Sequence, residues 1–164
     1  MPSTGQVSER VFFDAGVFIG ALCELDDRYP EAYPLVEDAR SGVIRACTEA
    51  SVLSEVYAQL TWERTLSRLS PVEAARVVRL LVQPPSAIEV LNCGGDAARK
   101  TMELAAAHQL TARRVHDARH ASTALVAGVR HVYTYDVGDW QLFEADGLKI
   151  AGPASVLRLL GRIV

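Results

Sequence analysis

Short β-prone runs alternate with segments of helical periodicity along most of this chain. Five runs have the composition of strands, at residues 10–14, 43–47, 86–92, 131–135 and 148–151. Apolar residues at helical spacing follow the first run, and further helical signals lie at 29–40, 48–62, from 71 onward, 96–108, 116–127 and 153–162. Strands that alternate with helices favour an α/β layer fold with a mainly parallel sheet. In such sheets ligands bind beyond the carboxyl ends of the strands.

Residue types that favour helix ends mark three of the expected helix boundaries. Thr48 belongs to the residue types favoured at N-caps, so we expect it to start the helix that follows it. Pro71 comes directly after Ser70 and suits the first position of a helix. Gly128 suits a left-handed C-cap at the end of the helix 116–127.

Length and charge limit the possible functions. The chain has 164 residues, 49% of them apolar, which is enough for one full core. We expect a flexible N-terminal leader at residues 1–8 and a single domain at residues 9–164. The formal net charge of -3 does not attract nucleic acid, so a polyanion would need a local basic patch or bound cations.

Cysteine spacing and hydropathy bear on the compartment. The cysteines Cys23, Cys47 and Cys93 are widely spaced and form no CxxC pair, which argues against a disulfide framework and a zinc knuckle. The N-terminal residues lack the pattern of a signal peptide, and the sequence has no apolar run long enough to cross a bilayer. We therefore expect a cytoplasmic protein.

Acidic residues stand at the ends of two expected strands. Asp14 ends the first run, and Asp136 directly follows the fourth. If these strands are neighbours, both carboxylates face one crevice beyond the carboxyl edge of the sheet. Asp117 lies in the first turn of its helix, at the edge of a small-residue face, and is therefore directed toward the protein. Glu55 lies well off the apolar stripe of its own helix, so periodicity alone does not select it.

The order and surroundings of four acids resemble a known family. The four are Asp14 in VFFDAGVFIGAL, Glu55 in TEASVLSEVYAQL, Asp117 in RRVHDARHASTAL and Asp136 in VYTYDVGDW. This order is similar to the acidic quartet of PIN-domain nucleases, and most similar to VapC-type toxins of bacterial toxin–antitoxin pairs. The resemblance spans residues 11–143. Each motif is loose alone, and the signal comes from all four in this order.

The resemblance carries expectations about fold and function. It implies a three-layer PIN-like α/β fold, with a central mainly parallel sheet flanked by helices. It also implies a metal-dependent endoribonuclease that hydrolyses phosphodiester bonds in single-stranded RNA regions, with Mg²⁺ or Mn²⁺ held by Asp14, Glu55, Asp117 and Asp136. A cognate small antitoxin protein is the implied partner. A homodimer is suggested by the resemblance and by the apolar helices between residues 48 and 82.

Two positions beside the acids can be compared with the family pattern. Thr134 matches the hydroxyl-bearing residue two positions before the last acid. Gly16 departs from the pattern, because the family usually carries Ser, Thr or Asn two residues after the first acid. A hydrogen-bonding group beside the metal is therefore missing, which bears on both activity and metal binding.

The charges of the four acids favour a metal site without the resemblance. Two carboxylates about 4 Å apart repel by about 4 kcal/mol at an effective dielectric of about 20. Several in one pocket would erode a typical stability of roughly 5–15 kcal/mol unless protonation or a cation neutralises them. Oxygen-only ligands suit a hard cation such as Mg²⁺ or Mn²⁺, which would stabilise a phosphodiester undergoing hydrolysis. Asp14, Asp117 and Asp136 are the expected main ligands, with Glu55 holding a water molecule or a second ion.

Other residues near these motifs have structural interpretations. Asp139 is expected to cap the turn DWQLFEA, with a role in the site as the alternative. His116 and His120 fall on the polar side of the helical wheel, so we expect them in solvent rather than on a metal. Arg113 and Arg114 would either bind RNA phosphates or form a plain solvated face. Four larger side chains are expected to bury against a neighbour or partner rather than stack on bases: Tyr57, Leu60, Trp62 and Leu66.

Two other functions remain open on the sequence alone. A catalytically weak PIN-like module would bind RNA or protein and use the acids only for a structural cation, and Gly16 keeps this alternative open. A phosphatase with Asp14 as its nucleophile fits less well, because no second Asp stands two residues later.

Overall fold

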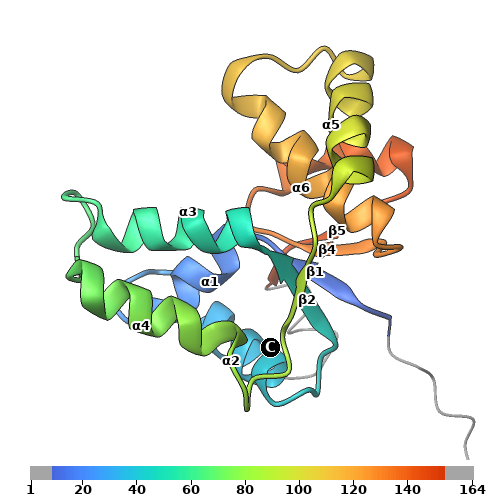
Figure 1. Cartoon of the computed structure of the whole chain (residues 1–164). Coiled ribbons are helices and arrows are strands. Elements are labelled where there is room, and N and C mark those ends of the chain that lie inside the picture. The colour runs from blue at the N-terminus through green and yellow to red at the C-terminus, as the bar shows by residue number, and fades with distance from the viewer. Residues whose placement is uncertain (1–8, 154–164) are drawn as a thin grey trace, which may run out of the picture.

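A five-stranded parallel sheet forms the centre of the protein (Figure 1). The computed structural model describes residues 9–153. The strand order is β3-β2-β1-β4-β5, and each adjacent pair is parallel. The strands are β1 (Val11–Phe13), β2 (Ala46–Glu49), β3 (Glu89–Leu91), β4 (His131–Tyr133) and β5 (Lys149–Ala151). The predicted α/β layer fold with a central parallel sheet is confirmed.

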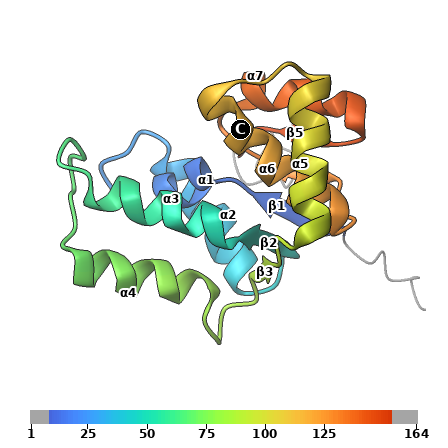
Figure 2. The ribbon, with the colours of Figure 1, turned by 45° about the horizontal axis from the view of Figure 1, so that its top comes forward.

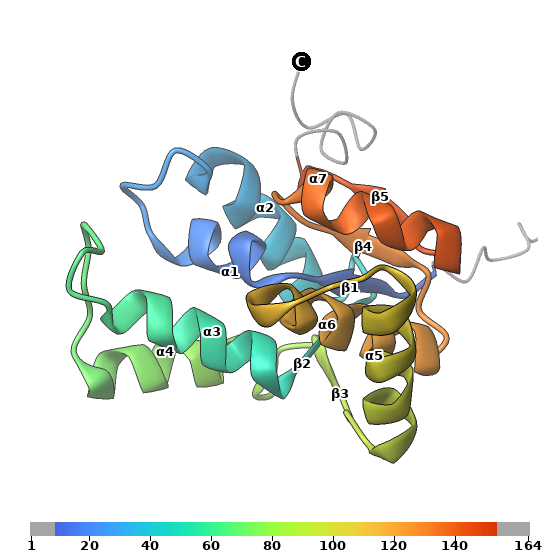
Figure 3. The same cartoon turned by 90° about the horizontal axis from the view of Figure 1, so that it is seen from above.

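Helices flank this sheet in a three-layer arrangement. They are α1 (Ala15–Leu22), α2 (Tyr29–Arg40), α3 (Ala50–Thr61), α4 (Pro71–Val82), α5 (Gly95–Ala107), α6 (Val115–Val126) and α7 (Val137–Trp140), with 3-10 turns η1 (Ala112–Arg114) and η2 (Gln141–Asp146). Helix α1 packs on α2 and α3, α3 packs on α4, and α5 packs on α6. Figure 2 shows α5 and α6 lying together, apart from α3 and α4. Seen from above, β1 runs between the α1–α2 pair and the α5–α6 pair (Figure 3).

The order of the strands brings the two strand-end acids together. Strand β1 lies between β2 and β4, and Phe13 is paired with Tyr133 in the register of β1 and β4. The residues that follow these two strands therefore emerge at the same edge of the sheet. The expectation that the strands before Asp14 and Asp136 are neighbours is confirmed.

The largest difference from the predicted elements is at the second strand. The expected strand at 43–47 lies instead at Ala46–Glu49, and Thr48 is a strand residue rather than the N-cap of α3. Thr48 pairs with Val90 in β3, and its hydroxyl donates to the carbonyl oxygen of Phe13 over 3.1 Å. These contacts with distant segments extend the strand and move the N-cap of the helix by one residue, from Thr48 to Glu49.

Other boundaries follow the local signals closely. Helix α4 begins at Pro71, and Ser70 and Glu73 form a reciprocal capping box at its N-terminus. Gly128, after α6, has a φ of 74°, as expected for a left-handed C-cap. The expected leader at 1–8 lies outside the described residues, and so does the expected closing helix at 153–162 apart from its first residue.

Buried apolar side chains pack between the sheet and the helices that flank it. Phe12, Phe13, Phe18, Trp140 and Phe143 are fully buried in this core. The three cysteines are free, two of them buried, and Cys93 is exposed. Within residues 9–153, none of the helices combines the length and apolar character needed to span a membrane.

Candidate active site

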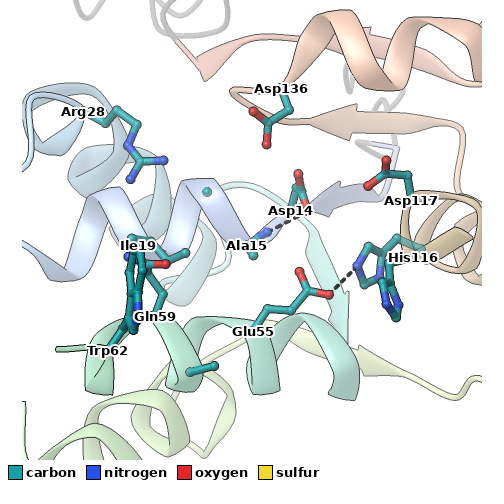
Figure 4. A pocket seen from close by; sticks show the side chains of 13 residues that line it. Asp14, Ala15, Ile19, Arg28, Glu55, Gln59, Trp62, His116, Asp117 and Asp136 are labelled. Atoms are coloured by element: carbon teal, nitrogen blue, oxygen red, sulfur yellow. Dashed lines mark hydrogen bonds and ion pairs between the residues drawn. The ribbon is translucent and has the colours of Figure 1, made fainter. Parts of the chain in front are cut away.

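Four acids from separate parts of the chain line one cavity. Asp14, Glu55, Asp117 and Asp136 all border a cavity of about 630 Å³ at the carboxyl edge of the sheet. They come from the end of β1, the middle of α3, the first turn of α6 and the end of β4. Figure 4 shows Asp117, Asp136 and Glu55 around the central Asp14. The structure therefore brings the sequence-predicted quartet into one place.

Asp14 is the buried member and is held by three donors. It directly follows β1 and is the N-cap of α1, where its Oδ1 accepts from the amide of Ala15 over 2.8 Å. Its Oδ2 accepts from the Thr134 hydroxyl over 2.8 Å and from Trp140 Nε1 over 3.2 Å. Only 6% of Asp14 is exposed, so these bonds fix a carboxylate at the floor of the cavity.

Thr134 connects Asp14 with Asp136. Its hydroxyl donates to Asp14 and accepts from the backbone N–H of Asp136 over 3.0 Å. Thr134 is fully buried, whereas Asp136 is exposed at the mouth of the cavity. The hydroxyl residue identified two positions before the last acid thus orients one acid and fixes the backbone of another.

The acids disturb one another's ionisation. Burial and the nearby Asp14 carboxylate raise the pKa of Asp117 to about 6. Burial and Asp14 also raise the pKa of Asp136, against the opposing charge of Arg28. Raised pKa values in a shared cavity are expected where several carboxylates lack a neutralising charge.

Asp139 contributes to this field without capping the turn. It lies exposed in the first turn of α7, and neither α7 nor η2 has a side-chain hydrogen bond at its N-cap. The expected capping role is therefore wrong. The Asp139 carboxylate adds to the raised pKa of both Asp117 and Asp136, although Asp139 does not border the cavity itself.

A buried histidine joins Glu55 to a second glutamate. Nε2 of His120 lies 2.9 Å from Glu55 Oε1, and its Nδ1 is in hydrogen-bond contact with Glu49 Oε1. Glu49 is fully buried and also accepts from the hydroxyls of Ser51 over 2.6 Å and Thr123 over 2.7 Å. Because ionised carboxylates only accept, both ring nitrogens of His120 act as donors.

This arrangement favours an imidazolium between two carboxylates. Burial lowers the pKa of His120, but the hydrogen bonds to Glu49 and Glu55 outweigh it and raise the pKa to about 9. Burial has the opposite effect on Glu49 and raises its pKa. The hydrogen bonds that Glu49 accepts, above all the one from His120, outweigh burial and bring its pKa below the usual value. Glu55 therefore enters the cavity with one oxygen already engaged by a cation.

The two histidines of α6 have different positions. His116 is exposed and borders the cavity, as its place on the polar side of the helix predicted. The same prediction for His120 is wrong, because only 2% of this residue is exposed. The helical wheel treats histidine as polar, and it contains no signal for a buried glutamate 71 residues away.

Arg28 occupies the space beside Gly16. The guanidinium Nη1 lies 3.3 Å from the position that a Cβ on residue 16 would take. Its Nε and Nη2 bind both oxygens of Asp26 over 2.9 and 2.7 Å, and its planar group lies over the Tyr135 ring at 5.4 Å. The missing family side chain at residue 16 thus leaves room for a cationic group, which sequence analysis did not identify.

The donor set fits a hard divalent cation. Asp14, Asp117 and Asp136 offer only oxygen ligands, and the raised pKa of Asp117 and of Asp136 is consistent with an excess of negative charge in the cavity. Within residues 9–153, no group of three His, Cys, Asp or Glu side chains is already arranged to hold a metal ion. Asp117 and Asp136 are less buried than Asp14, so these two carboxylates would be the ones to adjust around a cation held by the fixed Asp14.

Several solved structures share this fold. The toxin VapC20 of Mycobacterium tuberculosis, described as cleaving the sarcin-ricin loop, is 21% identical, with a TM-score of 0.62 over 85% of this chain and 96% of its own. FitAcB of Neisseria gonorrhoeae is 16% identical, with a TM-score of 0.61 over 88% and 98% of the two chains. VapBC2 of Rickettsia felis, solved with a DNA fragment from its promoter, is 12% identical, with a TM-score of 0.58 over 87% and 98%.

Sequence comparison identifies the family directly. No curated protein sequence matches this chain. The PIN domain family matches residues 11–141, which contain all four acids of the cavity. This chain therefore belongs to the PIN domain family.

Proposed function

We propose that this protein is an endoribonuclease that hydrolyses phosphodiester bonds in single-stranded RNA regions with the help of Mg²⁺ or Mn²⁺. The observation that supports this most is the shared cavity of Asp14, Glu55, Asp117 and Asp136. Membership of the PIN domain family and the fold shared with VapC20 agree with it. Hydrolysis would proceed without a covalent intermediate on the protein.

Asp14, Asp117 and Asp136 would hold the cation, directly or through water. When bound, it would supply Lewis-acid stabilisation of charge on the phosphate oxygens. Asp14 is suited to be the fixed ligand, because Thr134 and Trp140 hold one of its oxygens in place. Asp117 and Asp136 are less buried and can adjust.

Glu55 is suited to a different task. Its Oε1 is bonded to His120, and Arg119 Nη2 lies 3.7 Å from the same oxygen. A carboxylate with one engaged oxygen is held in a fixed orientation and keeps the other oxygen for a water molecule. We therefore assign Glu55 to orienting water in the cavity or holding a second ion, rather than to the main ligand set.

The biological role would be that of the toxin in a toxin–antitoxin pair, acting in the cytoplasm. Structures with this fold include VapC20, which is described as a toxin. The partner would be a cognate small antitoxin. We also propose a homodimer, which light scattering after size-exclusion chromatography tests; a monomer at micromolar concentration would contradict it.

RNA cleavage tests the proposed activity directly. A mixed single-stranded RNA is incubated with wild type, Asp14→Asn and the control Asp96→Asn, each with Mg²⁺, Mn²⁺ or EDTA. Asp96 is a suitable control because it is exposed on α5 and has the same charge. Cleavage by wild type and Asp96→Asn only with a cation, and none by Asp14→Asn, is the expected result. Equal cleavage by every sample would reveal a contaminating nuclease.

A binding module without strong catalysis is the second candidate. Gly16 favours it, because no side chain at this position can hydrogen-bond beside Asp14. Such a module would bind RNA or protein and use a cation only for structure. No cleavage with either metal, combined with retained RNA binding, would favour this candidate over the nuclease.

A further inference from the structure

The cavity of the acidic quartet has a second, chemically different end. Figure 4 shows Arg28, Ile19, Gln59 and Trp62 on one side of Asp14, with Asp117 and His116 on the other. A smaller cavity of about 190 Å³ adjoins this end and shares Ile19, Arg28 and Gln59 with it. The surface beside the acids thus continues from carboxylates to cationic, amide and aromatic groups.

Arg28 lines this end of the cavity, and its Nη1 has no hydrogen-bond partner among residues 9–153. Asp26 binds Nε and Nη2 of its guanidinium, while Nη1 faces Gly16 on the cavity wall. The salt bridge and the Tyr135 ring fix the plane of the group, so little side-chain freedom remains to be lost on binding. A guanidinium held in this way is suited to a phosphate oxygen.

Trp62 presents an exposed ring to the same end of the cavity. Its exposed fraction is 48%, whereas the other tryptophan, Trp140, is buried. Arg64 lies over the Trp62 ring at 5.6 Å and also borders the smaller cavity, which brings a second guanidinium to this end. An exposed indole beside two arginines has the composition of a surface that stacks unpaired bases.

The turn that carries Trp62 is fixed by hydrogen bonds. The backbone N–H of Thr65 donates to the Trp62 carbonyl over 3.0 Å, and the Thr65 hydroxyl donates to the Gln59 carbonyl over 2.6 Å. Gln59 Nε2 in turn donates to the Thr65 hydroxyl over 3.3 Å. The ring is therefore displayed on an ordered turn, and stacking on it requires little reorganisation of the backbone.

We propose that Arg28 and Trp62 form a subsite for one unpaired nucleotide next to the scissile phosphate, with Arg28 binding backbone phosphate and Trp62 stacking on the base. This inference rests on the proposed ribonuclease function of the same cavity. A paired base cannot stack on Trp62, because its faces are covered by neighbouring base pairs. The subsite therefore gives a physical reason for selecting single-stranded regions of RNA.

Tryptophan emission reports on the subsite without any need for cleavage. The chain has two tryptophans, and only Trp62 is exposed to a ligand. The measurement uses an Asp14→Asn background with EDTA, so that RNA stays intact, and a short unlabelled single-stranded RNA as probe. We expect saturable quenching, absent in Trp62→Phe and absent for duplex RNA. An abasic strand of the same length should bind with little quenching, because it retains phosphates but no bases.

Affinity separates the two contacts. With labelled RNA in the same background, Trp62→Leu should weaken binding by about fivefold to 100-fold, while Trp62→Phe should retain most of it. Arg28→Gln should weaken binding by about tenfold and reduce the slope of log affinity against log salt by about 0.7. The control Arg99→Gln removes an exposed arginine of α5 and should leave both quantities unchanged.

Each outcome distinguishes this subsite from the proposed function. RNA binding with no quenching, and no effect of Trp62→Leu or Arg28→Gln on affinity, would overturn the subsite even if the protein cleaves RNA. Quenching and weakened binding in a protein that never cleaves RNA would uphold the subsite while the nuclease proposal fails. Quenching by an abasic strand equal to that by RNA would contradict base stacking.

Discussion

Trp140 donates its indole N–H to Asp14 across 126 positions of the sequence. With Thr134 as the second donor to the same oxygen, the segment after β4 fixes the acid that ends β1. The orientation of Asp14 therefore depends on two buried residues that do not border the cavity, and substitution of either should impair cleavage even in protein that still folds.

Thr134→Val should reduce both stability and cleavage. Valine has a similar shape but leaves Asp14 without one donor and the Asp136 amide without its acceptor. Loss of a buried hydrogen bond to a charged group costs about 1.5–3 kcal/mol of unfolding free energy. Urea unfolding measures the cost, and RNA cleavage per folded protein measures the effect on Asp14. Thr134→Ser keeps the hydroxyl, and a defect as large as that of valine would contradict this role.

Stability should fall between about pH 6.5 and pH 9 because of His120. Its pKa is raised to about 9 in the folded protein, so the imidazolium stabilises the fold fully below the unfolded value near 6.5. This contribution of about 3 kcal/mol is lost as the pH rises through 9. Unfolding measured across this range should show the decline in wild type and a much flatter profile in His120→Gln. A flat wild-type profile would exclude the imidazolium.

Asp117→Asn should stabilise the cation-free protein at pH 8. Its pKa of about 6 in the folded protein lies above the usual value of 3.8. Ionisation of the carboxylate therefore begins to oppose folding above about pH 4, and the penalty is complete above about pH 6. Since the side chain is partly exposed, we expect a gain of about 1 kcal/mol after solvent screening. Thermal unfolding in EDTA measures this gain. Mn²⁺ should raise the melting temperature of wild type more than that of the variant; equal shifts would argue against Asp117 as a ligand.

Gly20→Ala should destabilise the fold, although alanine is normally about 1 kcal/mol better than glycine inside a helix. A Cβ at Gly20 would lie 2.9 Å from the Cβ of Arg28 and 3.1 Å from that of Ala32. One Cβ belongs to the N-cap of α2 and the other to its first turn, and neither can move without the backbone, so α1 and α2 would have to separate, at a cost of about 1–3 kcal/mol. Denaturant unfolding checks the sign. A more stable variant would show that α1 and α2 can accommodate a methyl group at this contact.

Local signals identified most of the fold because they act within a few residues. Pro71 and Ser70 start a helix through sterics and capping, and the β-prone run before Asp14 forms a buried strand. The sequence pattern predicts the second strand too early, at 43–47, because glutamate is disfavoured in strands and only distant partners compensate for the burial of Glu49.

The candidate site was only partly accessible to the same reasoning. The positions of Asp14 and Asp136 follow from strand ends in a parallel sheet. Only the family resemblance identifies Glu55. Its partner His120 is predicted to lie in solvent, because a helical wheel contains no tertiary contacts. Arg28 carries no motif, and its place in the cavity depends on how α1 and α2 pack around Gly16.

The central position of β1 has a consequence for synthesis on the ribosome. Asp14 emerges early, but two of its three hydrogen-bond donors, Thr134 and Trp140, are translated 120 and 126 residues later. A nascent or truncated chain that ends before Thr134 therefore has only the amide of Ala15 to hold its first acid. Premature termination should therefore yield fragments in which the cavity of the four acids is incomplete.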